Sequence, residues 1–198
     1  MNSKQTPLSK ASLDDIKEAL NTLHRGGVIL YPTDTIWGLG CDATNPDAVK
    51  RIYDIKRRTD AKALISLVDS ETKVQAYVKE VPEVAWDVME LSERPITIIF
   101  DGARNLAPNL LASDGSAALR ITKEAFSREL CMRFKKAIVS TSANISGEPS
   151  PQTFAEISDE IKASVDYICT SRQDETTSPP ASSIIKLGVG GEITIIRM

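Results

Sequence analysis

The chain has 198 residues, of which 41% are hydrophobic and 26% charged, and its formal net charge at pH 7 is −3. This length favours one domain over 1–198, with the core over about 12–198 and an N-terminal extension over 1–11. The small net charge argues against a protein built to coat nucleic acid. No apolar run could span a bilayer and the first ten residues lack the apolar stretch of a signal peptide, so we expect a cytoplasmic protein without a membrane partner.

The first half of the chain shows helix and strand signals in turn. Apolar residues at helical spacing after Ser12 predict a helix that Gly26-Gly27 ends, and Val28 to Tyr31 predict a buried strand. Asn45 as N-cap, with proline next, predicts a second helix whose last turn delivers basic residues. Further patterns predict a strand at 63–68, helices at 72–78 and 83–91, and a strand at 96–100.

The second half continues the alternation. It predicts strands at 117–121 and 137–140, a helix at 124–134 between them, a short helix near 154–161, and strands at 165–169, 183–187 and 193–197. The segment 171–182 is typical of a mobile loop, and Gly188 to Gly191 of a hairpin turn. These elements indicate an α/β fold, in which a single twisted, open, largely mixed sheet is flanked by helices.

Turn formers, hydroxyls and glycines crowd the ten residues from Tyr31 to Gly40, directly after the first predicted strand. Open α/β sheets bind ligands beyond the carboxyl ends of their strands. Thr33, Asp34 and Thr35 therefore form a predicted binding loop, with a plain turn as the alternative.

Basic residues cluster within and just after the second predicted helix, which begins at Asn45-Pro46. Six cations lie between positions 50 and 62, against two aspartates: Lys50, Arg51, Lys56, Arg57, Arg58 and Lys62. The cluster forms either a solvated helix face or a site for polyphosphate or a nucleic acid backbone.

A second polar loop runs from Ser140 to Pro151, again after an apolar strand. Its hydroxyls, amide and small residues let a ligand approach the backbone closely, although a plain loop is the alternative. Arg120, near the end of another predicted strand, could clamp a carboxylate with two parallel hydrogen bonds. Together these features suggest a site for an anionic ligand and a small polar second substrate.

The sequence lacks the motifs of several common nucleotide-binding and hydrolytic sites. No Walker loop, dinucleotide fingerprint or nucleophile elbow occurs. The only histidine, His24, lies near a predicted helix end and is interpreted as a surface or capping residue. Cys41, Cys131 and Cys169 are predicted to be buried free thiols, since no pair has metal-site spacing.

In this order and spacing the motifs resemble those of the threonylcarbamoyl-AMP synthase family, which has the YrdC-like fold. The resemblance spans about Ile16 to Arg197. It is carried by Pro32-Thr33-Asp34-Thr35-Ile36-Trp37-Gly38-Leu39, Lys56-x-Arg58, Leu119-Arg120, Ser142-Ala143-Asn144 and Ser150-Pro151. It implies an ATP-dependent nucleotidyltransferase that makes threonylcarbamoyl-AMP and pyrophosphate from threonine, bicarbonate and ATP. The product would pass to downstream proteins that install threonylcarbamoyladenosine in tRNA.

The resemblance also implies roles for individual residues. It places ATP on Arg58, Lys62, Ser116, Ser140, Ser142, Ser150 and Arg197. It places threonine on Thr35, Arg120 and Ser182, with Arg120 on the carboxylate. Catalytic roles fall on Lys56, Arg58, Ser142 and Asn144. Mg²⁺ would arrive on the triphosphate, held by phosphate oxygens and water, without protein metal ligands.

The chain departs from the family pattern at several positions. Thr59 replaces a proline after Lys-x-Arg, and Leu67 stands where some members place a threonine-contacting histidine. The usual Trp-Pro-Gly-Pro is reduced to Ser92 to Pro95. Residues 174–180 replace the glycines expected before Ser182.

Two rival functions remain open at this stage. One is a non-catalytic paralogue that binds double-stranded RNA, tRNA or the ribosome through the basic cluster. The other is a related carbamoyl-transfer enzyme that uses a different amino acid. The matched neutral groups favour the synthase, because binding a phosphate backbone requires cations but not such a set.

Overall fold

The computed structural model describes residues 8–58, 64–177 and 179–198. Its strands are β1 (Ile29–Tyr31), β2 (Gly38–Gly40), β3 (Ile65–Val68), β4 (Ile96–Phe100), β5 (Ala117–Ile121), β6 (Ile138–Ser142), β7 (Tyr167–Ile168), β8 (Ser183–Leu187) and β9 (Ile193–Arg197). Its α-helices are α1 (Lys10–His24), α2 (Pro46–Ile55), α3 (Glu71–Tyr77), α4 (Val84–Leu91), α5 (Ala125–Phe134) and α6 (Asp159–Ala163). Two short 3₁₀ helices, η1 (Pro108–Leu110) and η2 (Phe154–Glu156), complete the elements.

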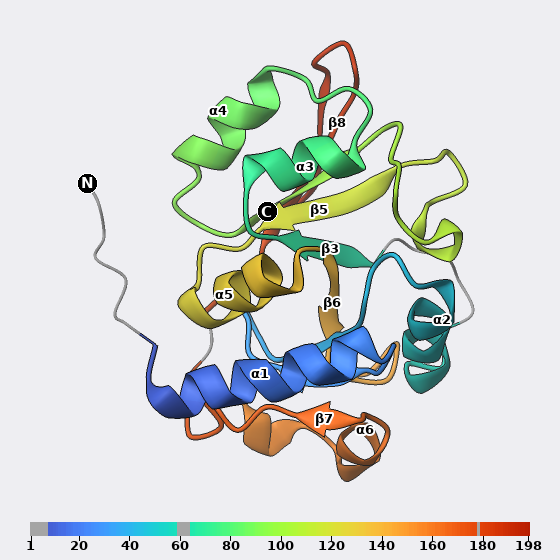
Figure 1. The fold of residues 1–198 in the computed structure, drawn as a ribbon. Helices are drawn as coiled ribbons and strands as arrows, with labels where there is room; N and C mark the ends of the chain where they lie inside the picture. The colour runs from blue at the N-terminus through green and yellow to red at the C-terminus, as the bar shows by residue number, and fades with distance from the viewer. Residues whose placement is uncertain (1–7, 59–63, 178) are drawn as a thin grey trace.

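The described strands form one open sheet in the order β7-β1-β2-β6-β3-β5-β4-β8-β9. Three strand pairs are parallel, β1 with β7, β3 with β5 and β4 with β8, and the others are antiparallel. Figure 1 shows α1, α3, α4 and α5 on the near side of the sheet. The prediction of an open, mixed α/β sheet flanked by helices is confirmed.

Local capping signals set the helix starts. Asn45 accepts hydrogen bonds from the amides of Asp47 and Ala48, as its position before Pro46 predicts. The first helix begins earlier than expected, because Ser9 rather than Ser12 is the N-cap, and its side chain accepts from the Ser12 amide. The helix expected near 154–161 is divided into η2 and α6, since Ser158 caps a new helix by accepting from Ile161.

Strand β2 was not predicted, because its two glycines and preceding turn formers resemble a loop. It pairs with β1 and β6, so part of the expected binding loop is sheet backbone. A Cβ atom on Gly40 would lie 2.5 Å from the Tyr31 ring, which explains why glycine stands there. Within the expected binding loop of residues 31–40, only residues 32–37 lie outside the strands.

The structure shows the surroundings of the cysteines, of His24 and of the glycine-rich turn at 188–191. All three cysteines are buried and free, and His24 is the last residue of α1 with its ring 5.1 Å from that of Phe134. Residues 188–191 form a hairpin turn between β8 and β9, closed by the bond from the Gly188 amide to the Glu192 carbonyl. The predicted cysteine and hairpin features are thus confirmed.

The two faces of the sheet have different roles. Residues paired across strands share a face, and side chains alternate along each strand. Ile65 pairs with Ala118 and with Ser140, so Arg120 and Ser142 lie on its face. Leu119 lies on the opposite face, which the four helices cover (Figure 1). Arg120 and Ser142 therefore point away from those helices.

Candidate functional site

A cavity of about 280 Å³ opens on the face of the sheet that carries Arg120. Strand ends, the 32–37 turn and the segment before β8 supply its walls. The lining residues are Thr35, Ile36, Trp37, Gly38, Arg58, Leu64, Ile65, Arg120, Ser140, Thr141, Ser142, Ser150, Gln152, Ala181, Ser182, Ile184 and Arg197. Hydroxyls and three arginines dominate this list, so the cavity suits a polar, anionic ligand.

Arg120 occupies the inner wall of the cavity. Its Nη2 lies 3.0 Å from a carboxylate oxygen of Asp34, and both side chains are less than a tenth exposed. Neither the Arg120 Nε nor that Asp34 oxygen has a well-formed hydrogen bond among the described residues. The guanidinium is therefore held near one carboxylate while retaining a donor for another.

Burial raises the pKa of Asp34, and the charge of Arg120 opposes this shift. Arg120 thus offsets part of the cost of burying the ionised carboxylate. A buried ion pair of this kind leaves a costly unpaired charge when one partner is removed.

The 33–35 turn is fixed by its own hydroxyls. Thr33 Oγ1 donates to the carbonyl of Ile36 at 2.8 Å and accepts from the amide of Thr35 at 3.1 Å. The hydroxyls of Thr33 and Thr35 lie 3.2 Å apart. These short-range bonds aim Thr35 into the cavity, where it is a lining residue.

Lys56 lies behind the cavity wall and does not line it. Its ammonium donates to the carbonyls of Ser142 and Asn144 at 2.6 and 2.7 Å, and to the Asn144 amide oxygen at 3.3 Å. Burial, reinforced by Arg58, lowers the pKa of Lys56 to about 8. Lys56 therefore holds the loop after β6 in place.

Arg58 reaches the cavity because the chain turns sharply after α2. Arg57 has a left-handed backbone conformation, with φ of 51°, and its side chain pairs with Glu160 at the surface. The amide of Arg58 bonds to the carbonyl of Tyr53, and its side chain lines the cavity. Arg57 therefore lies at the surface, whereas its neighbour Arg58 lines the cavity.

The opposite rim is built by Ser182 and Arg197. Arg197 donates twice to the Ser182 carbonyl, at 3.0 and 2.7 Å, and its guanidinium lies 3.4 Å from the Ser182 hydroxyl. The Ser182 hydroxyl also lies 3.0 Å from that of Thr97 on β4. Strand β9 is therefore tied to the segment before β8 at the cavity.

The structure brings most of the predicted site residues to one cavity: Thr35, Arg58, Arg120, Ser140, Ser142, Ser150, Ser182 and Arg197. Lys56 and Asn144 lie behind its wall, and Ser116 precedes β5 and is not a lining residue. Lys62 lies outside the described residues. Leu67 is fully buried in β3 and does not line the cavity.

Some lining residues were not predicted individually. Trp37 packs against Phe154 with ring centroids 4.8 Å apart, and Gln152 and Ile184 complete the walls. The Pro-Thr-Asp-Thr-Ile-Trp run signalled Trp37 only as part of a motif. Gln152 and Ile184 carry no sequence signal, because their place depends on the packing of distant segments.

Comparison with known proteins gives the family. The family model for Sua5, YciO and YrdC sequences, described as telomere recombination, matches residues 21–198. The chain belongs to this family. One relative is the threonylcarbamoyl-AMP synthase of Pseudoalteromonas translucida (strain TAC 125), which is 33% identical to this chain over 181 residues. The alignment covers 90% of this chain and 95% of that protein.

Solved structures of the Sua5/YciO/YrdC family share the fold. A doubly substituted P. abyssi Sua5 is 26% identical with a TM-score of 0.80, covering 87% of this chain and 50% of that one. P. abyssi Sua5 complexed with L-threonine is 23% identical with a TM-score of 0.79, covering 92% and 53% respectively. This chain thus spans about half the length of those Sua5 chains.

The described residues include neither a membrane-spanning helix nor a cluster of metal ligands. No helix among them is both long and apolar enough to cross a membrane. Within the same ranges, no three histidine, cysteine, aspartate or glutamate side chains gather as a set of metal ligands.

Proposed function

We propose that this protein is an L-threonylcarbamoyl-AMP synthase, which converts threonine, bicarbonate and ATP to threonylcarbamoyl-AMP and pyrophosphate. The observation that carries the proposal is one cavity that holds Arg120 with an uncommitted donor, beside Thr35 and Ser182, together with Arg58 and Arg197. The synthase name of a relative that the chain covers almost completely supports it.

The amino acid binds at the Arg120 side. Its carboxylate accepts two parallel hydrogen bonds from the Arg120 guanidinium, whose planar geometry suits them. Thr35 and Ser182 receive the ammonium or the hydroxyl of threonine. This assignment explains why a buried arginine, paired with Asp34 among the described residues, lines the cavity.

ATP binds across the Arg58 side. Arg58 neutralises phosphate oxygens, and the hydroxyls of Ser142 and Ser150 bond to the nucleotide, with Arg197 at the rim. Lys56 and Asn144 act indirectly by fixing the backbone of Ser142. Mg²⁺ accompanies the triphosphate and is held by phosphate oxygens and water.

The reaction requires positioning more than a protein nucleophile. The amine of threonine adds to the carbon of bicarbonate, and loss of water gives a carbamate. A carbamate oxygen then attacks the α-phosphorus of ATP, and the bond to the β-phosphate oxygen breaks to release pyrophosphate. The arginines stabilise the charge that develops, and the cavity holds the reacting groups together.

The decisive experiment measures pyrophosphate release with ATP, bicarbonate and threonine, and with each omitted in turn. We expect release only when all three are present. Release without threonine, or with no dependence on bicarbonate, would overturn the assignment.

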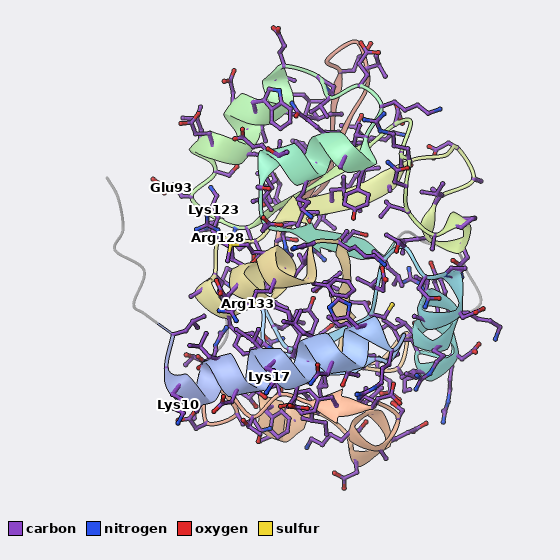
Figure 2. All side chains as sticks on the ribbon, viewed as in Figure 1. Lys10, Lys17, Glu93, Lys123, Arg128 and Arg133 are labelled. Atoms are coloured by element: carbon purple, nitrogen blue, oxygen red, sulfur yellow. The ribbon has the colours of Figure 1, made fainter. Side chains whose placement is uncertain are left out.

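Binding to RNA through the basic cluster at 50–62 is the competing function. Three cations of that cluster are paired, Lys50 with Asp54, Arg51 with Asp166 and Arg57 with Glu160. Other cations lie on the helices. Figure 2 shows Lys10 and Lys17 on α1 and Arg128 and Arg133 on α5, along the helical side of the molecule. Arg133 is paired with Glu129 there. A salt-sensitive affinity for duplex RNA or tRNA without pyrophosphate formation would favour this rival. Delivery of the product to downstream tRNA-modifying proteins in the cytoplasm is part of our proposal.

A further inference from the structure

Arg172 lies in the segment between β7 and β8, where its side chain reaches the 33–35 turn. Its Nη1 donates to the carbonyl of Thr33 at 3.0 Å. Only a quarter of the side chain is exposed, although the segment itself lies at the surface. Arg172 has a left-handed backbone conformation, with φ of 65°, which arginine adopts at some energetic cost. The contact therefore joins a distant segment to the turn that carries Asp34 and Thr35.

The guanidinium of Arg172 is held from two other sides. Its Nε and Nη2 donate to the two carboxylate oxygens of Glu175 at 2.7 and 2.8 Å. Its Nη1 also lies 3.4 Å from the carboxylate of Glu124, which caps α5 by accepting from the amides of Phe126 and Ser127. The start of α5 thus anchors Arg172, and Arg172 anchors the Thr33 carbonyl.

The charges continue from this anchor into the cavity. Arg172, Asp34 and Arg120 alternate in sign. Burial raises the pKa of Asp34, and Glu124 raises it further, whereas Arg120 and Arg172 lower it. Asp34 is the carboxylate beside Arg120, the residue that faces the amino-acid side of the cavity. Arg172 does not line that cavity, so any influence it has on a ligand acts through the turn.

We infer that Arg172 is a positioning residue for amino-acid binding, which fixes the Thr33 carbonyl so that Asp34 orients Arg120 and Thr35 faces the ligand. The inference rests on the proposed function. It gives residues 171–175 a role in the site, in a region where the chain departs from the glycines expected before Ser182. In the proposed function ATP is recognised by Arg58, which lines the cavity whereas Arg172 does not, so ATP binding should be independent of Arg172.

The test compares Arg172→Ala with wild type by threonine titration and by steady-state pyrophosphate release. Loss of a charged hydrogen bond that fixes the turn should raise the Kd and KM for threonine roughly tenfold. The KM for ATP should change by less than about twofold, since that side is untouched. Arg172→Lys keeps the charge and one donor, so it should recover part of the threonine affinity.

Two controls separate positioning from general damage. Arg133→Ala removes an equal charge on the outward side of α5 (Figure 2), and Arg57→Ala removes an exposed arginine that pairs with Glu160. Both should retain wild-type threonine affinity. If wild type binds no threonine, the proposed function fails. If wild type binds threonine and Arg172→Ala binds it equally well, or if the KM values for ATP and threonine rise together, the positioning role is wrong.

Discussion

Lys56 donates to both oxygens of Asn144, the backbone carbonyl at 2.7 Å and the side-chain amide oxygen at 3.3 Å. Asn144 in turn donates through its amide nitrogen to the carbonyls of Ile145 and Glu148. The lysine at the end of α2 and the loop after β6 are thus one bonded unit. The cavity residue Ser142 belongs to the same unit through its carbonyl.

Lys56→Met should therefore reduce both stability and activity. It leaves the carbonyls of Ser142 and Asn144 without their buried donor, which costs about 1–3 kcal/mol in the free energy of unfolding. Urea denaturation and pyrophosphate release measure the two effects. Lys50→Met on the same helix removes an exposed pair with Asp54 and should change stability by less than about 1 kcal/mol. Equal effects of the two substitutions would contradict the buried role of Lys56.

Lys56 also predicts a pH dependence. Its pKa is lowered from 10.5 to about 8, so above that pH the neutral amine has two donors for three acceptors. We expect pyrophosphate release to fall as the pH rises from about 8 to 10. The unfolded chain holds this proton longer and binds more protons in that window, so the contribution of Lys56 to the free energy of unfolding rises with pH.

The two pH trends can be measured separately. Rate profiles give the activity, and urea denaturation near pH 7.5 and 9.5 gives the stability of wild type relative to Lys56→Met. The variant serves as its own reference for all other titrating groups. A rate profile that stays flat through this range would show that Lys56 titrates elsewhere.

Arg58→Ala should impair nucleotide use without unfolding the protein, because its half-buried side chain lines the cavity. Loss of charge-assisted bonds to phosphate should raise the KM for ATP about tenfold or more. The neighbouring substitution Arg57→Ala is a matched control, since Arg57 pairs with Glu160 at the surface. An ATP KM that is unchanged in Arg58→Ala, or raised equally in both, would place the phosphates elsewhere.

Arg120→Lys tests the carboxylate clamp. A lysine cannot make two parallel bonds to the ligand while remaining beside Asp34, so threonine affinity should fall by about tenfold or more. Threonine should also bind more tightly than valine, because valine leaves buried hydroxyl partners unpaired. Calorimetric titration with threonine, serine and valine gives the order. Equal affinities for threonine and valine would contradict threonine as the substrate.

Local signals made much of the fold predictable. Asn45-Pro46 marked the start of α2 because capping depends on neighbouring residues, and the strands at 96–100 and 117–121 have the bounds expected from their apolar runs. Strand β2 escaped prediction because glycine weakens every strand signal, although tertiary packing against Tyr31 requires it. Strand prediction relies on the alternation of apolar and polar side chains, and two of the three residues of β2 are glycines without side chains.

The site was predictable as a set of residues but less so as an arrangement. The family resemblance gave Lys56 and Arg58 catalytic roles together, whereas burial separates them into a loop anchor and a lining residue. Which side chain enters a cavity depends on the turn after α2, where Arg57 adopts a left-handed backbone. Arg172 could not be identified at all, because its partner Thr33 lies 139 positions away along the chain.

The glycine strand β2 has a consequence for how substrate preference can change. Gly38 lines the cavity, and a Cβ atom there would meet the Ser140 hydroxyl at 3.2 Å, while Gly40 has no room beside Tyr31. A ligand beside Gly38 contacts backbone peptide groups, which a substitution does not change chemically. A new amine or nucleotide preference can therefore arise more readily at wall residues outside the strands, such as Gln152 and Ala181, than at Gly38.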